Sequence, residues 1–118
     1  MNQMSRRDDQ DNERRFNISQ SLPEVSSLDK EQLLVDLRNF EKKLESANIR
    51  SHRDMLRVWT LGLKGPALQW IELEKNSSAD MQNAYWRTRS PNASDADYLH
   101  YWRLCRAVLM RRAACATN

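Results

Sequence analysis

The side chains most suited to metal or nucleophilic chemistry are few and scattered in this chain of 118 residues. The two histidines, His52 and His100, are isolated, and the two cysteines, Cys105 and Cys115, lie near the C-terminus. A metal site needs three or four convergent ligands, and neither a C-x-x-C pair nor a Cys/His zinc spacing is present. No disulfide framework is visible, which favours free thiols in a reducing compartment. We therefore predict no metal site and no cofactor.

No constellation typical of an enzyme is present either. The chain has no phosphate-binding glycine loop, no H-E-x-x-H and no G-x-S-x-G motif. Its carboxylates fall at expected helix caps and on outward helix faces. Asp95 and Asp97, for example, would point in different directions on a helix. We predict a protein that is not an enzyme and that takes no small-molecule substrate.

Arginines near the C-terminus are the main group that suggests a ligand. They are Arg103, Arg106, Arg111 and Arg112, in a chain with a net charge of +3. On the outward face of a helix they could contact the phosphates of RNA or DNA. Because a charge so close to neutral is common on protein surfaces, a merely solvated face is the other interpretation.

A helix-turn-helix over residues 53–72 is a second route to DNA binding. Two short helices with a glycine between them fit its outline. However, residues 66–74 offer Gln69 as the only good base reader, beside Glu72 and Glu74, and contain no arginine or lysine. Since phosphate contacts supply most of the affinity for DNA, this acidic segment argues against that function.

The elements that must position these residues are predicted to be helices. Two glycines and three prolines are too few for a sheet with many hairpins. Capping residues and apolar periodicity predict helices that start after Asp29, after Ser51, at Pro66, after Ser77 and after Ser94. They are expected to end near residues 47, 63, 75, 88 and 114. The predicted fold is all-α, a compact bundle of about five helices over residues 27–116.

Residues 1–26 are predicted to be a disordered polar tail. Their sparse apolar side chains cannot offset the entropy lost on ordering. A short docking peptide around Phe16 to Val25 is the alternative. The N-terminus lacks the apolar core of a signal peptide, and no run approaches the roughly 20 apolar residues of a membrane span. We therefore expect an intracellular, cytoplasmic protein.

The helices are expected to be organised around residues 56–73, L-R-V-W-T-L-G-L-K-G-P-A-L-Q-W-I-E-L. Gly65 is predicted to be the N-cap or the last loop residue before a new helix, and Pro66 the first helical residue. Trp59 and Trp70, on either side of this break, are the predicted large anchors of the core.

Residues 30–75 resemble the Gag capsid domain of gypsy-type long-terminal-repeat retrotransposons. The resemblance lies in F-E-K-K-L-E-S-A-N and, further on, L-x-L-K-G-P-A-L-Q-W-I-E-L, where the matching positions are Phe40, Glu41, Leu63, Gly65, Ala67 and Trp70. It implies an all-α, retroviral-capsid-like N-terminal lobe that self-associates into particles around the element's RNA. The same lobe occurs in host genes domesticated from such elements. The chain departs from the family in having no zinc knuckle, and residues 98–109 echo the usual continuation only loosely.

The leading hypothesis is therefore a non-enzymatic structural protein, a Gag or capsid-like lobe that forms weak homo-oligomers and packages RNA. Trp59 and Pro66 join the matched positions as its fold-defining residues. Two alternatives stay open. One is a small helical RNA- or DNA-binding protein that uses the basic C-terminal helix. The other is an adaptor in which Trp86 or Trp102 binds a partner protein.

Overall fold

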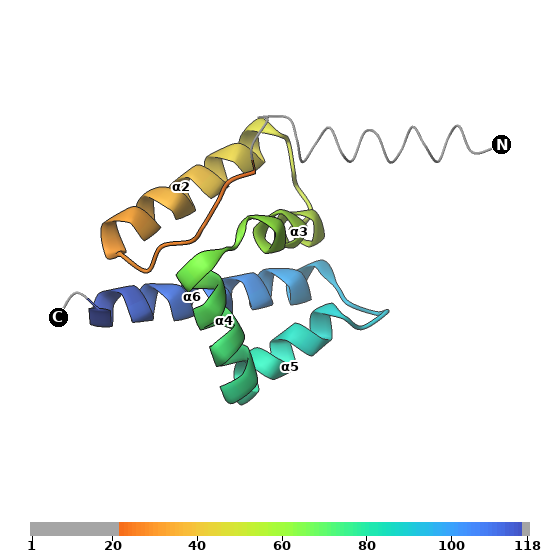
Figure 1. The fold of residues 1–118 in the computed structure, drawn as a ribbon. Coiled ribbons are helices and arrows are strands. Elements are labelled where there is room, and N and C mark those ends of the chain that lie inside the picture. Colours follow the sequence, from red (N-terminus) through yellow and green to blue (C-terminus); the bar gives the residue numbers. More distant parts are fainter. Residues whose placement is uncertain (1–21, 117–118) are drawn as a thin grey trace.

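The computed structural model describes residues 22–116, and the structural statements below concern this part of the chain. Within it the regular elements are five α-helices and no strand (Figure 1). The predicted all-α class is confirmed. The helices are α2 (Lys30–Ser46), α3 (His52–Gly62), α4 (Gly65–Ser77), α5 (Ala79–Thr88) and α6 (Asp95–Ala116).

Side-chain caps set the starts of four described helices, α2, α3, α5 and α6, because an oxygen at the N-cap accepts a backbone N–H that has no partner within the helix. Asp29 accepts from Gln32 N at 3.1 Å, and Ser51 accepts from Asp54 N at 3.0 Å. The cap of α5 is Ser78, and the prediction of Ser77 is wrong by one residue. Ser77 instead ends α4 and donates its hydroxyl to Leu73 O at 2.7 Å.

Helix α6 is the centre of the bundle, since it contacts each of the other four described helices. In Figure 1, α2 and α3 lie on one side of α6 and α5 lies on the other, while α4 crosses it. This arrangement follows from its length of 22 residues and from buried side chains spread along it. These include Tyr101, Trp102, Cys105, Val108, Leu109 and Ala113.

Three aromatic rings from three helices meet in the core. Phe40 of α2 lies edge-on to Trp59 of α3, with ring centroids 5.3 Å apart, and stacks on Trp102 of α6 at 6.1 Å. Trp59 and Trp102 are also edge-on, at 6.2 Å. Trp59 is buried, as predicted. Trp102 is also buried, at 8% exposed, so the suggestion that its ring binds a partner protein from the surface is wrong. Trp70 is only partly buried at the edge of this core, so it is a lesser anchor than predicted.

Residues 22–26, here called the N-terminal strap, belong to the folded domain. Val25 is 1% exposed and forms a parallel bridge with Leu63. Its N–H donates to Gly62 O and its carbonyl accepts from Lys64 N, both at 2.9 Å. The predicted boundary at residue 26 is therefore too late, because the strap pairs with the break between α3 and α4. The rest of the predicted tail, including Phe16, lies outside the described residues.

The break between α3 and α4 uses its two glycines differently. Gly62 is buried under the strap, and a Cβ built on it would lie 2.0 Å from Pro23 O. Gly65 has a φ of +55°, in the left-handed region that favours glycine. It is the first residue of α4, and Lys64 is the N-cap, so the predicted place of Gly65 is wrong by one residue.

Candidate functional site

The residues of the fold-defining motif have structural surroundings. Phe40 and Ala67 are fully buried and Leu63 is 6% exposed, so these three positions pack the core and its helix break. Glu41 and Pro66 are exposed. The three buried side chains thus help to hold α2, α3 and α4 together.

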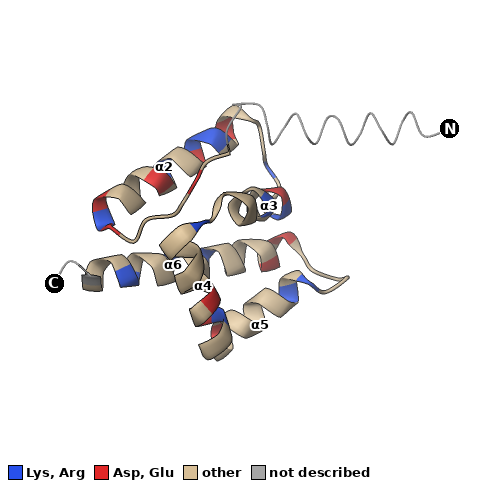
Figure 2. Ribbon diagram, viewed as in Figure 1, with Lys and Arg blue, Asp and Glu red and all other residues tan. Residues whose placement is uncertain are grey.

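The four arginines of α6 do not form one basic face. Arg103 and Arg112 are about half a turn out of phase on a helix with about 3.6 residues per turn. The structure accordingly divides the four between two cavities, and Figure 2 shows basic positions spread over several helices, not gathered on α6 alone. Arg103 and Arg106 line a shallow cavity with Glu41 and Trp102, whereas Arg111 and Arg112 line another with Trp70 and Glu74.

Each pair also shares its cavity with a carboxylate and includes one arginine whose Nε atom is buried. A carboxylate lines each cavity, Glu41 in one and Glu74 in the other. The Nε atoms of Arg106 and Arg112 are buried and lack hydrogen-bond partners among the described residues. The Arg112 guanidinium lies over the Trp70 ring, 5.1 Å from its centroid, a cation–π contact that favours packing over ligand binding. The four arginines therefore do not share one cavity, and their contact with nucleic acid stays a prediction.

A different set of arginines gathers on a groove between α3, α5 and α6. The groove has a volume of about 510 Å³, and Arg53, Arg57 and Arg89 line it together with Tyr85 and Tyr98. None of its lining residues is acidic. This group is not evident from the sequence, because Arg89 is far from the other two along the chain. The one available signal was the spacing of Arg53 and Arg57, which puts them one turn apart on the same face of α3.

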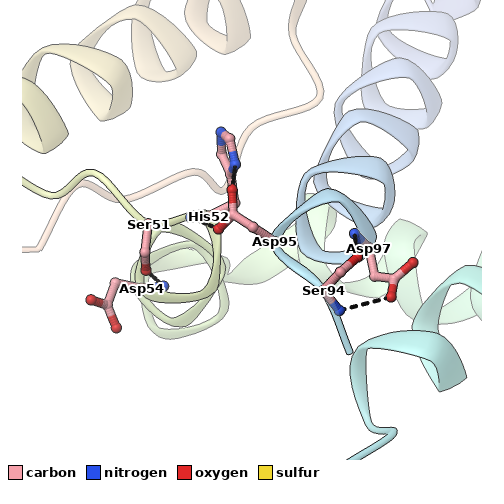
Figure 3. Close-up of polar contacts among 6 residues, drawn as sticks. All are labelled: Ser51, His52, Asp54, Ser94, Asp95 and Asp97. Atoms are coloured by element: carbon pink, nitrogen blue, oxygen red, sulfur yellow. Dashed lines mark hydrogen bonds and ion pairs between the residues drawn. The ribbon is translucent and has the colours of Figure 1, made fainter. Parts of the chain in front are cut away.

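A histidine–aspartate pair joins the starts of α3 and α6 (Figure 3). Asp95 Oδ1 accepts from the backbone N–H of His52 at 2.8 Å, and Asp95 Oδ2 pairs with the His52 ring at Nδ1. These contacts hold the pKa of Asp95 below its ordinary value, with the backbone hydrogen bond as the largest cause. His52 was predicted to be isolated, but its contacts with Asp95 connect α3 to α6.

The described neighbours of this pair are engaged in helix caps. The neighbouring hydroxyl, Ser51 Oγ, is engaged as the cap of α3 (Figure 3). Asp97 forms a capping box with Ser94, and the Ser94 backbone N–H, donating at 2.9 Å, is the largest cause that lowers its pKa. Among the described residues no group of three His, Cys, Asp or Glu side chains could hold a metal ion.

The two cysteines are free and differ sharply in environment. Cys105 is 0% exposed, and burial raises the pKa of its thiol to about 12. Cys115 is exposed. Since the thiolate is the reactive form, Cys105 is a packing residue and not a nucleophile.

Comparisons with known proteins do not assign this chain to a family, so it is identified only by its fold class. No family model, curated protein or solved structure matches this chain. No described helix has the length and apolar character that crossing a bilayer requires. The chain is thus an all-α domain in which α2, α3, α4 and α5 pack around α6.

Proposed function

We propose that this chain is a Gag capsid-like lobe, of the kind found in gypsy-type retrotransposons or in host genes domesticated from them. It acts as a non-enzymatic structural protein of the cytoplasm that self-associates into particles around RNA. The observation that carries the proposal is the step from α3 into α4. There Leu63 and Ala67 are buried and Gly65 takes a positive φ, so the residues that resemble the family hold the helix break.

Exposed apolar side chains on several helices support weak self-association. The large ones are Leu34 and Val35 on α2, Leu61 on α3, Leu73 on α4 and Trp86 on α5. These side chains are spread over four helices, so no single helix presents a large exposed apolar face. A lattice that sums many small contacts needs several weak surfaces of this kind on one subunit.

Sedimentation velocity from dilute to millimolar protein tests the proposal. We expect the weight-average mass to rise reversibly with concentration. The substitutions Val35→Glu, Leu73→Glu and Trp86→Glu, made singly, should each weaken this rise, because a buried carboxylate at a contact is costly. A strict monomer at millimolar concentration would rule out self-assembly by this chain alone.

Matched controls separate loss of contact from added charge. Asn39, Gln69 and Gln82 are exposed residues of α2, α4 and α5. Their substitution by glutamate adds the same charge to the same helices without removing an exposed apolar side chain. If these controls weaken association as much as the apolar substitutions do, the apolar surfaces are not the contacts.

A further inference from the structure

We propose that the groove between α3, α5 and α6 binds single-stranded nucleic acid through Arg53, Arg57 and Arg89. This inference is independent of the capsid-like assignment, because it rests on the charges and shape of one groove. It also differs from the nucleic-acid surface predicted on α6, whose arginines the fold separates.

The groove is lined by cations from two parts of the chain. Arg53 and Arg57 lie one turn apart on α3, and Arg89 follows directly after α5. All three are exposed. Within the described residues Arg53 and Arg89 form no ion pair. A phosphate backbone that lies in the groove would meet guanidinium groups from both α3 and the end of α5, and guanidinium matches phosphate geometry through paired N–H donors.

The shape of the groove favours a single strand over a duplex. A volume of about 510 Å³ is the size of a small-ligand site and can admit part of one strand, not a double helix. Arg53 and Arg57 are about 6 Å apart at Cβ, as one helical turn requires. This separation is comparable with that of consecutive phosphates along a strand, so the two arginines can contact neighbouring phosphates.

An exposed aromatic ring beside the groove favours nucleic acid over an acidic peptide. Trp86 is 66% exposed and lies edge-on to Tyr85 of the groove wall, with centroids 5.4 Å apart. It precedes Arg89 by about one turn and so lies on the same side of α5. The Tyr85 ring is less available, because the Lys75 ammonium lies 4.2 Å from its centroid. Bases can therefore stack on Trp86 while their phosphates contact the arginines.

Fluorescence anisotropy with a labelled oligouridylate tests the proposal over a series of salt concentrations. We expect the wild-type chain to bind with a steep salt dependence. The triple variant Arg53→Gln, Arg57→Gln, Arg89→Gln should lose about 100-fold in affinity, or roughly five-fold for each exposed contact. The slope of log affinity against log salt should fall by about 2, since each phosphate contact of a single strand contributes about 0.7. Trp86→Ala should weaken binding further through lost stacking.

The matched control is the triple variant Arg38→Gln, Arg103→Gln, Arg111→Gln. These three arginines are also exposed, and the change in net charge is the same. We expect this control to bind within about two-fold of wild type at physiological salt, because surface charges more than about 8 Å away are screened. An equal loss in both triple variants would show that net charge alone drives binding and would overturn the proposal.

Two further measurements keep the test decisive. An NMR titration of the unaltered chain with the oligouridylate should shift amide signals of α3 and the end of α5, and shifts confined to residues 103–115 of α6 would overturn the proposal. Polyglutamate at the same charge concentration should fail to displace the oligonucleotide, and efficient displacement would assign the groove to acidic peptides instead. A chain that sediments as a strict monomer but passes these tests would overturn the proposed capsid function alone.

Discussion

Replacement of Gly62 by alanine tests how the strap fastens the break between α3 and α4. A Cβ at this position would lie 2.0 Å from Pro23 O, far inside the 3.4 Å at which ordinary contact begins. Because this oxygen belongs to the main chain, no side-chain rotation can relieve the overlap. The strap must therefore move away from α3, by more than about 1 Å.

The cost follows from what the strap contributes. Burial of the Val25 side chain contributes about 2 kcal/mol. Three backbone hydrogen bonds join the strap to the break, from Val25 N to Gly62 O, from Lys64 N to Val25 O and from Ala67 N to Ser26 O. At about 1 kcal/mol each, they bring the upper limit to about 5 kcal/mol. Alanine recovers up to about 1 kcal/mol over glycine in a helix. We therefore expect Gly62→Ala to lower the free energy of unfolding by about 2–4 kcal/mol.

Urea denaturation followed by circular dichroism measures this loss, and a double-mutant cycle identifies its source. Val25→Ala should cost about 2 kcal/mol in the wild-type background and much less in the Gly62→Ala background, where the strap is already displaced. An unchanged or increased stability of Gly62→Ala would refute the reasoning. An equal cost of Val25→Ala in both backgrounds would show that the strap stays in place.

Gly65→Ala provides the control at the neighbouring glycine. The nearest atom to a Cβ there is Ser26 Cβ at 3.5 Å, so space is available, but the φ of +55° is unfavourable for alanine. We expect a loss of about 1–2 kcal/mol from backbone conformation alone. This variant should show no coupling to Val25→Ala, since the strap is not displaced.

Three other predictions concern the core, the thiols and the acid response. Trp102→Ala should destabilise the domain by about 3–5 kcal/mol in urea, because it removes the α6 ring from the aromatic cluster, and a loss under about 1 kcal/mol would contradict that role. A thiol reagent at neutral pH should label Cys115 rapidly and Cys105 only on unfolding, as mass spectrometry can follow; equal rates would contradict the burial of Cys105. Because its pKa is lowered in the folded state, ionised Asp95 adds to the free energy of unfolding above its ordinary pKa of 3.8. This stabilisation is lost as the pH falls through the folded-state pKa. Thermal melts should accordingly show less acid destabilisation in Asp95→Asn than in wild type, and parallel curves would refute this linkage.

The helices were largely predictable because their signals are local. Ser51 accepts a hydrogen bond from a residue three positions later, and Leu33, Leu37, Phe40 and Leu44 repeat at the spacing of one buried face. Both kinds of signal are contained within one or two helical turns. The errors at Ser77 and Gly65 amount to one residue each, where adjacent residues offer equivalent caps or turns.

The candidate site was not predictable in the same way. Arg89 joins Arg53 and Arg57 only because α3 and α5 both pack on α6 and border one groove, and no periodicity in the sequence marks that packing. His52 meets Asp95 for a similar reason, through the packing of α3 on α6. The arginines of α6 are the opposite case. They are close in sequence and were grouped on one surface, but they line two different cavities.

By itself the sequence determined an all-helical domain, the approximate limits of its helices and the glycine-containing break at residues 62–65. Periodicity, capping and backbone freedom act over a few residues, so these features are written in adjacent positions. Only the tertiary structure decided that α6 is the central helix, that the strap closes over Gly62 and that three distant arginines share one groove. Those outcomes depend on which faces can be buried together, a condition that involves the whole chain at once.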